Sequence, residues 1–246
     1  MAKSSSPINS PFASYDGADV LRLIWRSWGQ EKTGKNHFGF TAPGPIYGQY
    51  FDPGGIEGVA QKFIRGEVAD QPAKAIHSKF YRHRKDMEQE ECKALRDEFV
   101  ADYHYALNHK PGLVQWDETE LWALCRFAEF GRESARGREY GPLNGFYRGL
   151  LQDAYDAGVN LQLIQKVKES WKDDKPTGKF EPTGFKEANY VVQLNLEHSW
   201  SKDDGFAIKV VNCRQNMELA GETFTGFTFA DMGQAIFPDS QPDDWA

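Results

Sequence analysis

An octapeptide near the start of the chain, residues 29–36, nearly matches the phosphate-binding loop pattern G-x-x-x-x-G-K-[ST]. It reads Gly-Gln-Glu-Lys-Thr-Gly-Lys-Asn and departs from the pattern only in its last residue. In this pattern the glycines let backbone N–H groups close around a polyphosphate, the lysine reaches the terminal phosphates, and the last hydroxyl binds Mg²⁺. Asn36 stands where that hydroxyl belongs. The pattern therefore predicts nucleotide binding and leaves hydrolysis in question.

We expect the loop and the start of the following helix to hold the nucleotide. Lys35 would neutralise the β and γ phosphates, and the amides around Thr33 to Asn36 would form an anion nest. The alternative is a plain glycine turn between a strand and a helix. The expected nucleotide-binding residues are Gly29, Gln30, Glu31, Lys32, Thr33, Gly34, Lys35, Asn36 and His37.

A second motif supplies an acid for a metal ion. Residues 113–118 form an apolar run ending in Asp117 and Glu118, which looks like the Walker B strand of a P-loop protein. We therefore expect Asp117 and Asn36 to be the Mg²⁺ ligands. The competing interpretation makes Asp117 the N-cap of the next helix, a role for which Thr119 also competes.

The catalytic base has two candidates. Glu118 could polarise water beside the metal, and Glu57 could do so from the end of the neighbouring strand; either could instead be a surface acid. Gln165, at the end of a central strand, is expected to sense the γ phosphate, although an ordinary core amide would fit equally well.

Strands and helices alternate along the chain and would position these residues. Apolar runs predict strands and residue spacing predicts helices, with Gly158 as a helix C-cap. The pattern favours a three-layer α/β fold with a mostly parallel sheet. The expected strands are 20–25, 46–51, 113–116, 160–167, 190–196 and 206–211, and the expected helices are 35–40, 59–64, 86–107, 121–130 and 143–155.

Some segments do not fit this alternation. Residues 169–187 are polar, rich in lysine and without periodicity, so we expect a mobile loop. Several glutamines fall within expected strands, where an unpaired buried amide costs about 1 to 3 kcal/mol, so some of them must face a polar site. They are Gln49, Gln115, Gln162, Gln165 and Gln193. We divide the chain into a flexible tail over 1–16, one domain over 17–237 and an acidic C-terminal tail over 238–246.

The composition limits the classes of protein to which the chain can belong. Its 246 residues are 40% hydrophobic and 14% aromatic, which is enough for a large core. A formal net charge of -7 argues against coating nucleic acid by charge alone. The 3 cysteines lie far apart without a C-x-x-C pair, and no apolar run approaches about 18 residues. We expect a cytoplasmic protein without membrane association.

Basic residues nevertheless gather in three places. The first is a run over 74–85 with interleaved aromatic residues, which reads either as a strand-binding surface or as the solvated face of a helix. The second lies in an expected loop over 131–142, and the third lies in the loop over 169–187. Both loops would open on the side of the phosphate site if the sheet is parallel.

Four segments together resemble a known family: residues 28–46, the turn over 52–58, the segment 117–122 and the strand end 213–216. They look like the phage-encoded RecA-like P-loop ATPases, compact relatives of recombinases and of the AAA family. The resemblance covers about 20–238. It implies a core that binds ATP with Mg²⁺ and acts on single-stranded DNA in phage recombination or annealing, in the cytoplasm of a host cell. Lys209 and Arg214 would then reach the nucleotide of a neighbouring subunit, so a homo-oligomer is implied.

Other functions remain open at this stage. Asn36 is a poorer Mg²⁺ ligand than a hydroxyl, so the chain could be a nucleotide-binding switch or scaffold without catalysis. A nucleotide or small-molecule kinase is a weaker alternative, because no lid or acceptor-site signature is recognisable. The acidic tail could compete with DNA for a basic face or fray as an ordinary terminus.

Overall fold

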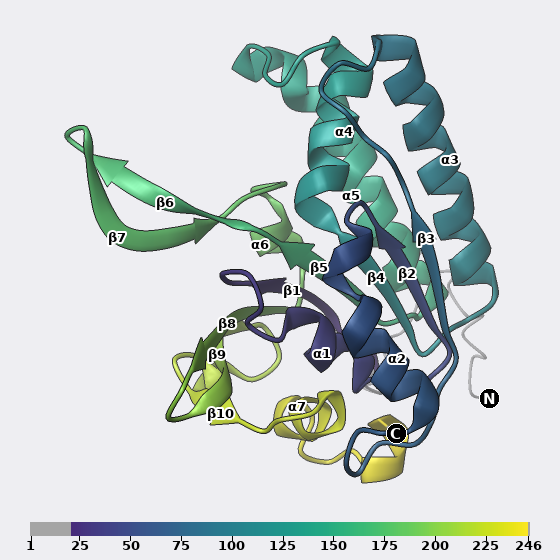
Figure 1. The fold of residues 1–246 in the computed structure, drawn as a ribbon, viewed down its shortest axis with the longest axis vertical. Helices are drawn as coiled ribbons and strands as arrows, with labels where there is room; N and C mark the ends of the chain where they lie inside the picture. Colours follow the sequence, from purple (N-terminus) through teal and green to yellow (C-terminus); the bar gives the residue numbers. More distant parts are fainter. Residues whose placement is uncertain (1–20, 246) are drawn as a thin grey trace, which may run out of the picture.

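An eight-stranded sheet runs through the centre of the computed structural model, which describes residues 21–245 (Figure 1). Its strand order is β10-β9-β8-β1-β5-β4-β2-β3. The expected α/β architecture is thereby confirmed. The strands are β1 (Ile24–Trp28), β2 (Ile46–Tyr50), β3 (Ile76–Phe80), β4 (Leu113–Asp117), β5 (Leu161–Gln165), β8 (Leu194–Ser201), β9 (Gly205–Cys213) and β10 (Thr223–Thr225).

The sheet is mostly parallel, with an antiparallel edge. Strands β8, β1, β5, β4, β2 and β3 all run in one direction, whereas β9 and β10 are antiparallel to their neighbours. The carboxyl ends of the parallel strands therefore meet at one edge of the sheet. That edge carries the phosphate-loop motif after β1 and Asp117 at the end of β4.

Helices cover both faces of the sheet, as expected for a parallel sheet. One hydrophobic cluster joins the sheet to α1, α2 and α7, and a second joins it to α3, α4 and α5. The short α6 (Ala188–Val191) precedes β8. The other helices are α1 (Lys35–Phe40), α2 (Glu57–Arg65), α3 (Gln89–Asn108), α4 (Glu118–Phe130), α5 (Tyr140–Ala157) and α7 (Phe229–Ile236), with 3-10 turns η1 (Pro53–Gly55), η2 (Gly137–Glu139), η3 (Met217–Leu219) and η4 (Pro242–Trp245).

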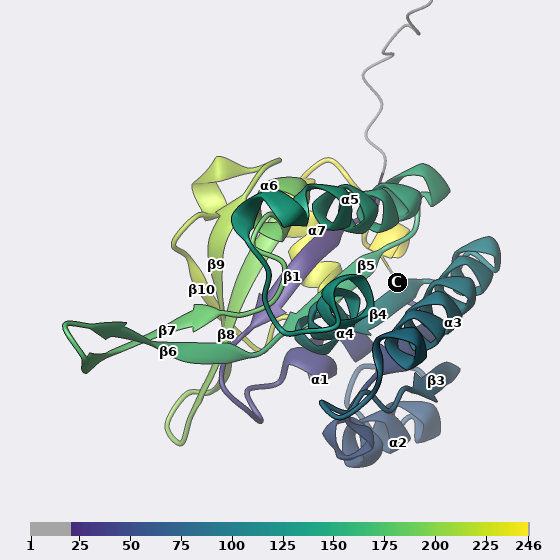
Figure 2. The same ribbon diagram turned by 90° about the horizontal axis from the view of Figure 1, so that it is seen from above.

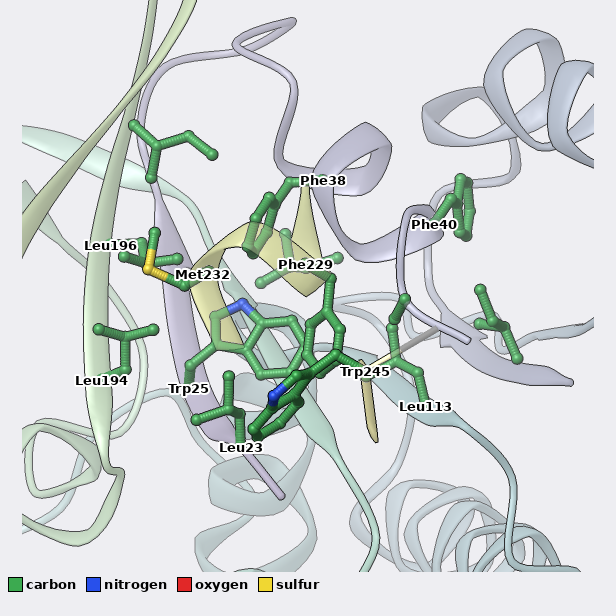
Figure 3. Close-up of a cluster of buried hydrophobic side chains, with 14 of the residues drawn as sticks. Leu23, Trp25, Phe38, Phe40, Leu113, Leu194, Leu196, Phe229, Met232 and Trp245 are labelled. Carbon is green, nitrogen blue, oxygen red and sulfur yellow. The ribbon is translucent and has the colours of Figure 1, made fainter. Parts of the chain in front are cut away.

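Figure 3 shows the first cluster, where α1 and α7 meet the sheet. Trp25 of β1 packs against Phe38 of α1 and Phe229 of α7, with ring centroids 6.0 and 5.4 Å away. Trp25 and Phe229 are fully buried. Because this packing joins the phosphate-loop strand to the helix that follows it, it fixes both ends of the loop between them.

The first strand lies further along the chain than the apolar run predicts. The expected strand covered 20–25, whereas β1 is Ile24–Trp28 and includes Arg26 and Ser27, both buried. Each has a polar partner that allows its burial: Arg26 donates to Asn195, and Ser27 bonds to Gln162. Residue 20 and the tail expected over 1–16 lie outside the described residues.

Residues 167–182 form a projecting hairpin, so the expected mobile loop over 169–187 is wrong. Strands β6 (Val167–Lys172) and β7 (Lys175–Pro182) pair with each other in a separate two-stranded sheet. We call this hairpin the arm; it extends away from the rest of the molecule in Figures 1 and 2. Asp173 and Asp174 both have positive φ, 52 and 57°, as a two-residue type I′ turn requires.

The end of the chain packs on the core, which differs from the expected free acidic tail. Residues Pro242–Trp245 form η4, and Trp245 is 1% exposed. Its ring stacks on Phe237 at 5.5 Å and meets Phe229 edge-on at 5.9 Å. The buried Trp245, labelled in Figure 3, therefore holds the acidic residues of this segment against the core.

The buried glutamines are bonded across the sheet. On the α1 face, Tyr50 donates to Gln115, Gln115 donates to Gln162, and Gln162 donates to Ser27 at 2.7 Å. On the opposite face, Trp116 donates to Gln49 at 3.1 Å. These partners offset much of the cost of burying the amides, and the strands predicted around Gln49, Gln115, Gln162 and Gln165 are present. The strand predicted over 190–196 is wrong in its first half, because residues 188–191 form α6 and Gln193 directly precedes β8.

Candidate functional site at the carboxyl edge of the sheet

The phosphate-loop motif connects β1 to α1, the strand, loop and helix order that the motif requires. Gly34 is the N-cap of α1 and has φ 86°, a left-handed conformation that favours glycine. A Cβ there would also press on the ring of Phe206 in β9. The fold thus requires the second glycine of the motif both for its backbone conformation and for the close approach of β9.

Lys35 lies inside the loop. Its Nζ donates to the carbonyl oxygens of Gly29 and Gln30, at 2.9 and 2.6 Å. Burial lowers the pKa of Lys35 to about 8, while the nearby acids Glu31 and Asp117 oppose that shift. The ammonium group is therefore partly desolvated and pulled toward loop carbonyls that an anionic ligand could replace.

Asn36 and Asp117 are held by the same segment, the turn after β2. The side-chain amide of Asn36 donates to the carbonyl of Gly55 at 3.0 Å, and Asp117 accepts from the N–H of Phe51 at 3.0 Å. The Oδ1 of Asn36 is buried and has no hydrogen-bond partner among residues 21–245. Burial raises the pKa of Asp117, and the Phe51 bond opposes the increase.

Glu118 is fully buried, on the face of the sheet opposite Asp117. It accepts from the N–H of Phe185 at 2.7 Å, from Gln165 at 2.8 Å and from the Tyr147 hydroxyl at 3.2 Å. Burial raises the pKa of Glu118 to about 7, and these donors and Arg26 oppose the increase. The carboxyl group is surrounded by donors and has no access to solvent in this conformation.

Glu57 and Gln165 complete the acids and amides expected near the phosphates. Glu57 is the first residue of α2, two residues after Gly55, and its side chain is exposed. Gln165 ends β5 and is 1% exposed; its amide donates to Glu118. Its Oε1 is buried without a hydrogen-bond partner in the described part of the chain.

The two basic residues expected to act in a neighbouring subunit lie at different heights along one strand: Lys209 is within β9, and Arg214 directly follows it. Lys209 is exposed and pairs with Glu197, which pairs with Trp28 at the end of β1. Lys209 is therefore level with the start of the loop, two strands or about 10 Å away. The N–H of Arg214 bonds to Gln193, just before β8, so Arg214 lies at the opposite edge.

A cavity of about 190 Å³ opens beside the loop, a feature that the sequence patterns did not predict. Thr33 and Gly34 line it together with His37 and Phe206, whose rings lie nearly parallel, 18° apart, with centroids 6.2 Å apart. Its remaining walls are mainly apolar, with Gln71, Thr228 and His198 adding polar groups. Such a cavity suits a flat ring with a few polar substituents.

A second, larger cavity of about 800 Å³ lies at the other end of α1 and shares Thr41, Gln71 and Thr228 with the first. Lys74 lines it and donates to Ala42 and Gln71, at 2.8 and 3.1 Å. Burial lowers the pKa of Lys74 to about 8. This lysine is thus separated from the other basic residues of the run over 74–85.

The rest of that run does not form one basic face. Residues Ile76–Phe80 form the edge strand β3, so the alternative of a solvated helix face is wrong. Lys79 bonds to Glu98 at 2.8 Å and to Asp102, and Arg84 bonds to Asp86 at 3.2 Å. The acids of α3 and of the adjoining turn therefore neutralise part of the run.

The other two basic groups lie on different structures. Arg132, Arg136 and Arg138 fall in the connection at the distal end of α4, a helix of 13 residues that spans about 20 Å. The lysines of the expected loop over 169–187 lie largely on the arm, which leaves the sheet directly after Gln165. Of the three lysine- and arginine-bearing segments, the arm is therefore connected most directly to the edge that carries residues 29–36.

Within residues 21–245, no group of three or more His, Cys, Asp or Glu side chains is placed to hold a metal ion. In the same part of the chain, no helix combines the length and the apolar character needed to span a bilayer. In comparisons with known proteins, no protein-family model and no curated protein sequence matches the chain.

Proposed function

We propose that the chain is a RecA-like P-loop protein that binds ATP with Mg²⁺ at residues 29–37, hydrolyses it and acts on single-stranded DNA. One observation carries the proposal. Lys35 lies in the first turn of the helix after β1, and Asp117 ends β4; a single strand, β5, separates β1 and β4 in the parallel part of the sheet. Both residues therefore face the same edge, where ligands of open α/β sheets bind.

The loop supports binding of the phosphates. Lys35 would exchange the carbonyls of Gly29 and Gln30 for phosphate oxygens, which carry full charge and bind an ammonium more strongly. The base would enter the cavity of about 190 Å³ beside the rings of His37 and Phe206. ATP would thus be held from its phosphates to its ring by residues on both sides of Gly34.

The residues also fit Mg²⁺. The buried Oδ1 of Asn36, unpaired within residues 21–245, is an oxygen of the kind that binds this ion, and Asp117 provides a carboxylate. These two residues would hold the ion, directly or through water. When bound, Mg²⁺ neutralises charge on the phosphates.

The geometry supports Glu57 as the base that polarises the attacking water. Glu57 is exposed beside the turn that holds Asn36 and Asp117, so water can reach it. Glu118 already receives three hydrogen bonds within a closed site, so it would have to break them to act. Of the two acids, Glu57 thus needs less rearrangement.

The arm supports contact with single-stranded DNA through stacking. Trp171 is 66% exposed and Phe180 is 40% exposed, and aromatic rings stack on bases whatever the sequence. Lysines at 168, 172, 175 and 179 could contact phosphates, but acids at 169, 173, 174 and 181 balance their charge. We therefore assign more of the affinity to stacking than to charge.

A nucleotide-binding switch without catalysis is the second candidate. The amide of Asn36 is tied to Gly55, and a carboxamide binds Mg²⁺ less well than a hydroxyl at this position. Under this alternative ATP would bind and order the arm, and turnover would be absent. Lys209, level with the loop, would serve a neighbouring subunit under either candidate if the chain assembles.

Measuring ATP hydrolysis with and without single-stranded DNA separates the two candidates. If the chain is an ATPase, it should hydrolyse ATP, and single-stranded DNA should stimulate the hydrolysis. The Asn36→Thr variant should then hydrolyse ATP faster than the wild type, because it restores the missing hydroxyl. ATP binding without hydrolysis in either protein would favour the switch. If Asn36→Thr leaves a weak activity unchanged, Asn36 is not the cause of the weak activity.

A further inference from the structure

Both ends of the arm are attached to one carboxyl group. The chain enters the arm after Gln165, whose amide donates to Oε2 of Glu118 at 2.8 Å. It leaves the arm through Phe185, whose N–H donates to Oε1 of Glu118 at 2.7 Å. The two oxygens of one buried side chain thus hold the entry and the exit of the arm.

The segment that leaves the arm passes close to this carboxyl group. Gly184 has φ 107°, which favours glycine, and a Cβ at this position would overlap Oε2 of Glu118. Tyr147 of α5 adds a donor to Oε1 at 3.2 Å. Glu118 therefore fills a closed site formed by β5, α5 and the segment that leaves the arm.

The next residue extends the same attachment. The hydroxyl of Thr119 accepts from the N–H of Lys166 at 3.0 Å and lies 3.1 Å from the hydroxyl of Thr183. Thr183 in turn donates its N–H to the carbonyl of Lys166 at 2.8 Å. Residues 118 and 119 thus join the two roots of the arm to the start of α4.

Asp117 precedes Glu118 directly, and it faces the phosphate loop. A ligand that shifts the backbone at Asp117 would either carry Gln165 and Phe185 with Glu118 or strain their hydrogen bonds to it, because the four residues are joined through one peptide bond and two hydrogen bonds. A ligand on the arm would act in the reverse direction, as thermodynamic linkage requires.

We infer that Glu118 is a positioning residue, which fixes the base of the arm and transmits occupancy of the phosphate site to it. The transmission rests on the proposed nucleotide site, whereas the fixing of the arm does not. Glu118 touches neither phosphate nor water in this account. Its effect on any reaction passes through the orientation of the arm.

Amide hydrogen exchange of the full chain tests the inference, with peptides covering 166–185 followed with and without ATP and Mg²⁺. In the wild type, nucleotide should change exchange at the roots of the arm. In Glu118→Ala, exchange of the free protein should be about tenfold faster over 166–185, with a much smaller change in β1 and β4, and nucleotide should no longer alter it.

Conservative and control variants separate positioning from a general loss of structure. Glu118→Gln should restore the wild-type pattern, because a rotated Gln165 can accept from the new amide with its unpaired Oε1. Glu120→Gln removes one charge from the same helix and the bond to Lys166 at the entry root, and should change exchange little. If Glu118→Ala does not fold, Gln165→Met removes the entry bond alone and should loosen residues 166–172.

Two results would overturn the inference. One is arm exchange in Glu118→Ala equal to that of the wild type; the other is a nucleotide response that persists in this variant. If nucleotide fails to bind the wild type, the proposed function and the transmission both fall, and exchange of the free variants still decides whether Glu118 fixes the arm.

Discussion

Asp117 and Glu118 are consecutive residues whose carboxyl groups lie on opposite faces of the sheet. Asp117 accepts from Phe51 beside the phosphate loop, whereas Glu118 accepts from Phe185 between β5 and α5. The sequence motif placed both acids at one catalytic site, whereas this geometry separates them. Under the proposed function, Asp117 would be available to a metal ion, and Glu118 would hold the base of the arm.

This division predicts different effects for the two candidate bases. Glu57→Gln should lower the turnover of ATP by about 100-fold or more, the range of a lost general base, while nucleotide affinity changes little. Glu118→Gln should lower turnover by less than about tenfold, because its effect is indirect. Steady-state hydrolysis and nucleotide titration of both variants check this, and the reverse ranking would make Glu118 the base.

The buried histidine of β8 should make the fold sensitive to acid. Burial lowers the pKa of His198 to about 3, and the positive charge of Lys35 adds to the decrease. Because an unfolded histidine titrates near 6.5, the unfolded state takes up the proton first, and stability falls as the pH drops below that value. The expected loss from this residue is about 2 kcal/mol between pH 7 and pH 5.

Urea unfolding at several pH values measures this loss. His198→Gln keeps a polar group near Ser27, to which His198 Nε2 bonds at 3.0 Å, and removes the titration. The variant should therefore show a shallower fall in the free energy of unfolding between pH 7 and pH 5. An identical slope in both proteins would assign the acid sensitivity to other groups.

The attachment of the chain end predicts a large effect of Trp245. Because its ring is buried against Phe229 and Phe237, Trp245→Ala should reduce the free energy of unfolding by about 3 to 5 kcal/mol. Asp243→Ala, at an exposed residue of the same turn, is the matched control and should cost less than about 0.5 kcal/mol. A loss below about 1 kcal/mol in Trp245→Ala would mean that the segment does not pack on the core.

The same attachment changes how competition with DNA should be tested. Deleting 239–246 would remove a core residue along with the acids, so a change in affinity would have two causes. Replacing Asp239, Asp243 and Asp244 with Asn removes the charge and keeps the anchor. Tighter binding of single strands by that variant supports competition, and unchanged affinity removes the idea.

The arm predicts a stacking contribution to DNA binding. Trp171→Ala should weaken binding of single strands by about 1 to 3 kcal/mol, the usual value of one stacked base, with little change in the salt dependence. Tyr105→Ala, at an aromatic residue on α3 that is 58% exposed, serves as the control. Fluorescence anisotropy with a labelled oligonucleotide measures both, and equal affinities of the two variants would exclude the arm as the contact.

Sequence reasoning found the elements that carry a strong local signal. The helix expected over 35–40 is α1 with the same bounds, because the motif fixes its start and two prolines follow it. Gly158 caps α5 with φ 68°, as its position after a regular apolar stripe predicted. In both cases the signal lies within a few neighbouring residues.

The features that it missed depend on contacts between distant residues. The strands of the arm are mostly exposed on both faces, so they have no hydrophobic alternation to detect. Glu118 can be buried because Phe185 and Tyr147 donate hydrogen bonds to its carboxyl group, and both residues are far away in sequence. Strand alternation could not give the direction of the Glu118 side chain, because β4 ends at Asp117 and Glu118 is the first residue of α4.

Titration of the full chain with ATP and Mg²⁺ by calorimetry tests the central claim most directly, with Lys35→Ala and Lys32→Ala measured alongside. Lys35 is half-buried within the loop and Lys32 is exposed on it, so the two variants remove the same charge from one loop. We expect saturable binding that Lys35→Ala weakens by about 100-fold and Lys32→Ala by less than about threefold. Absence of binding at millimolar ATP in the wild type, or equal affinities in the two variants, would contradict it.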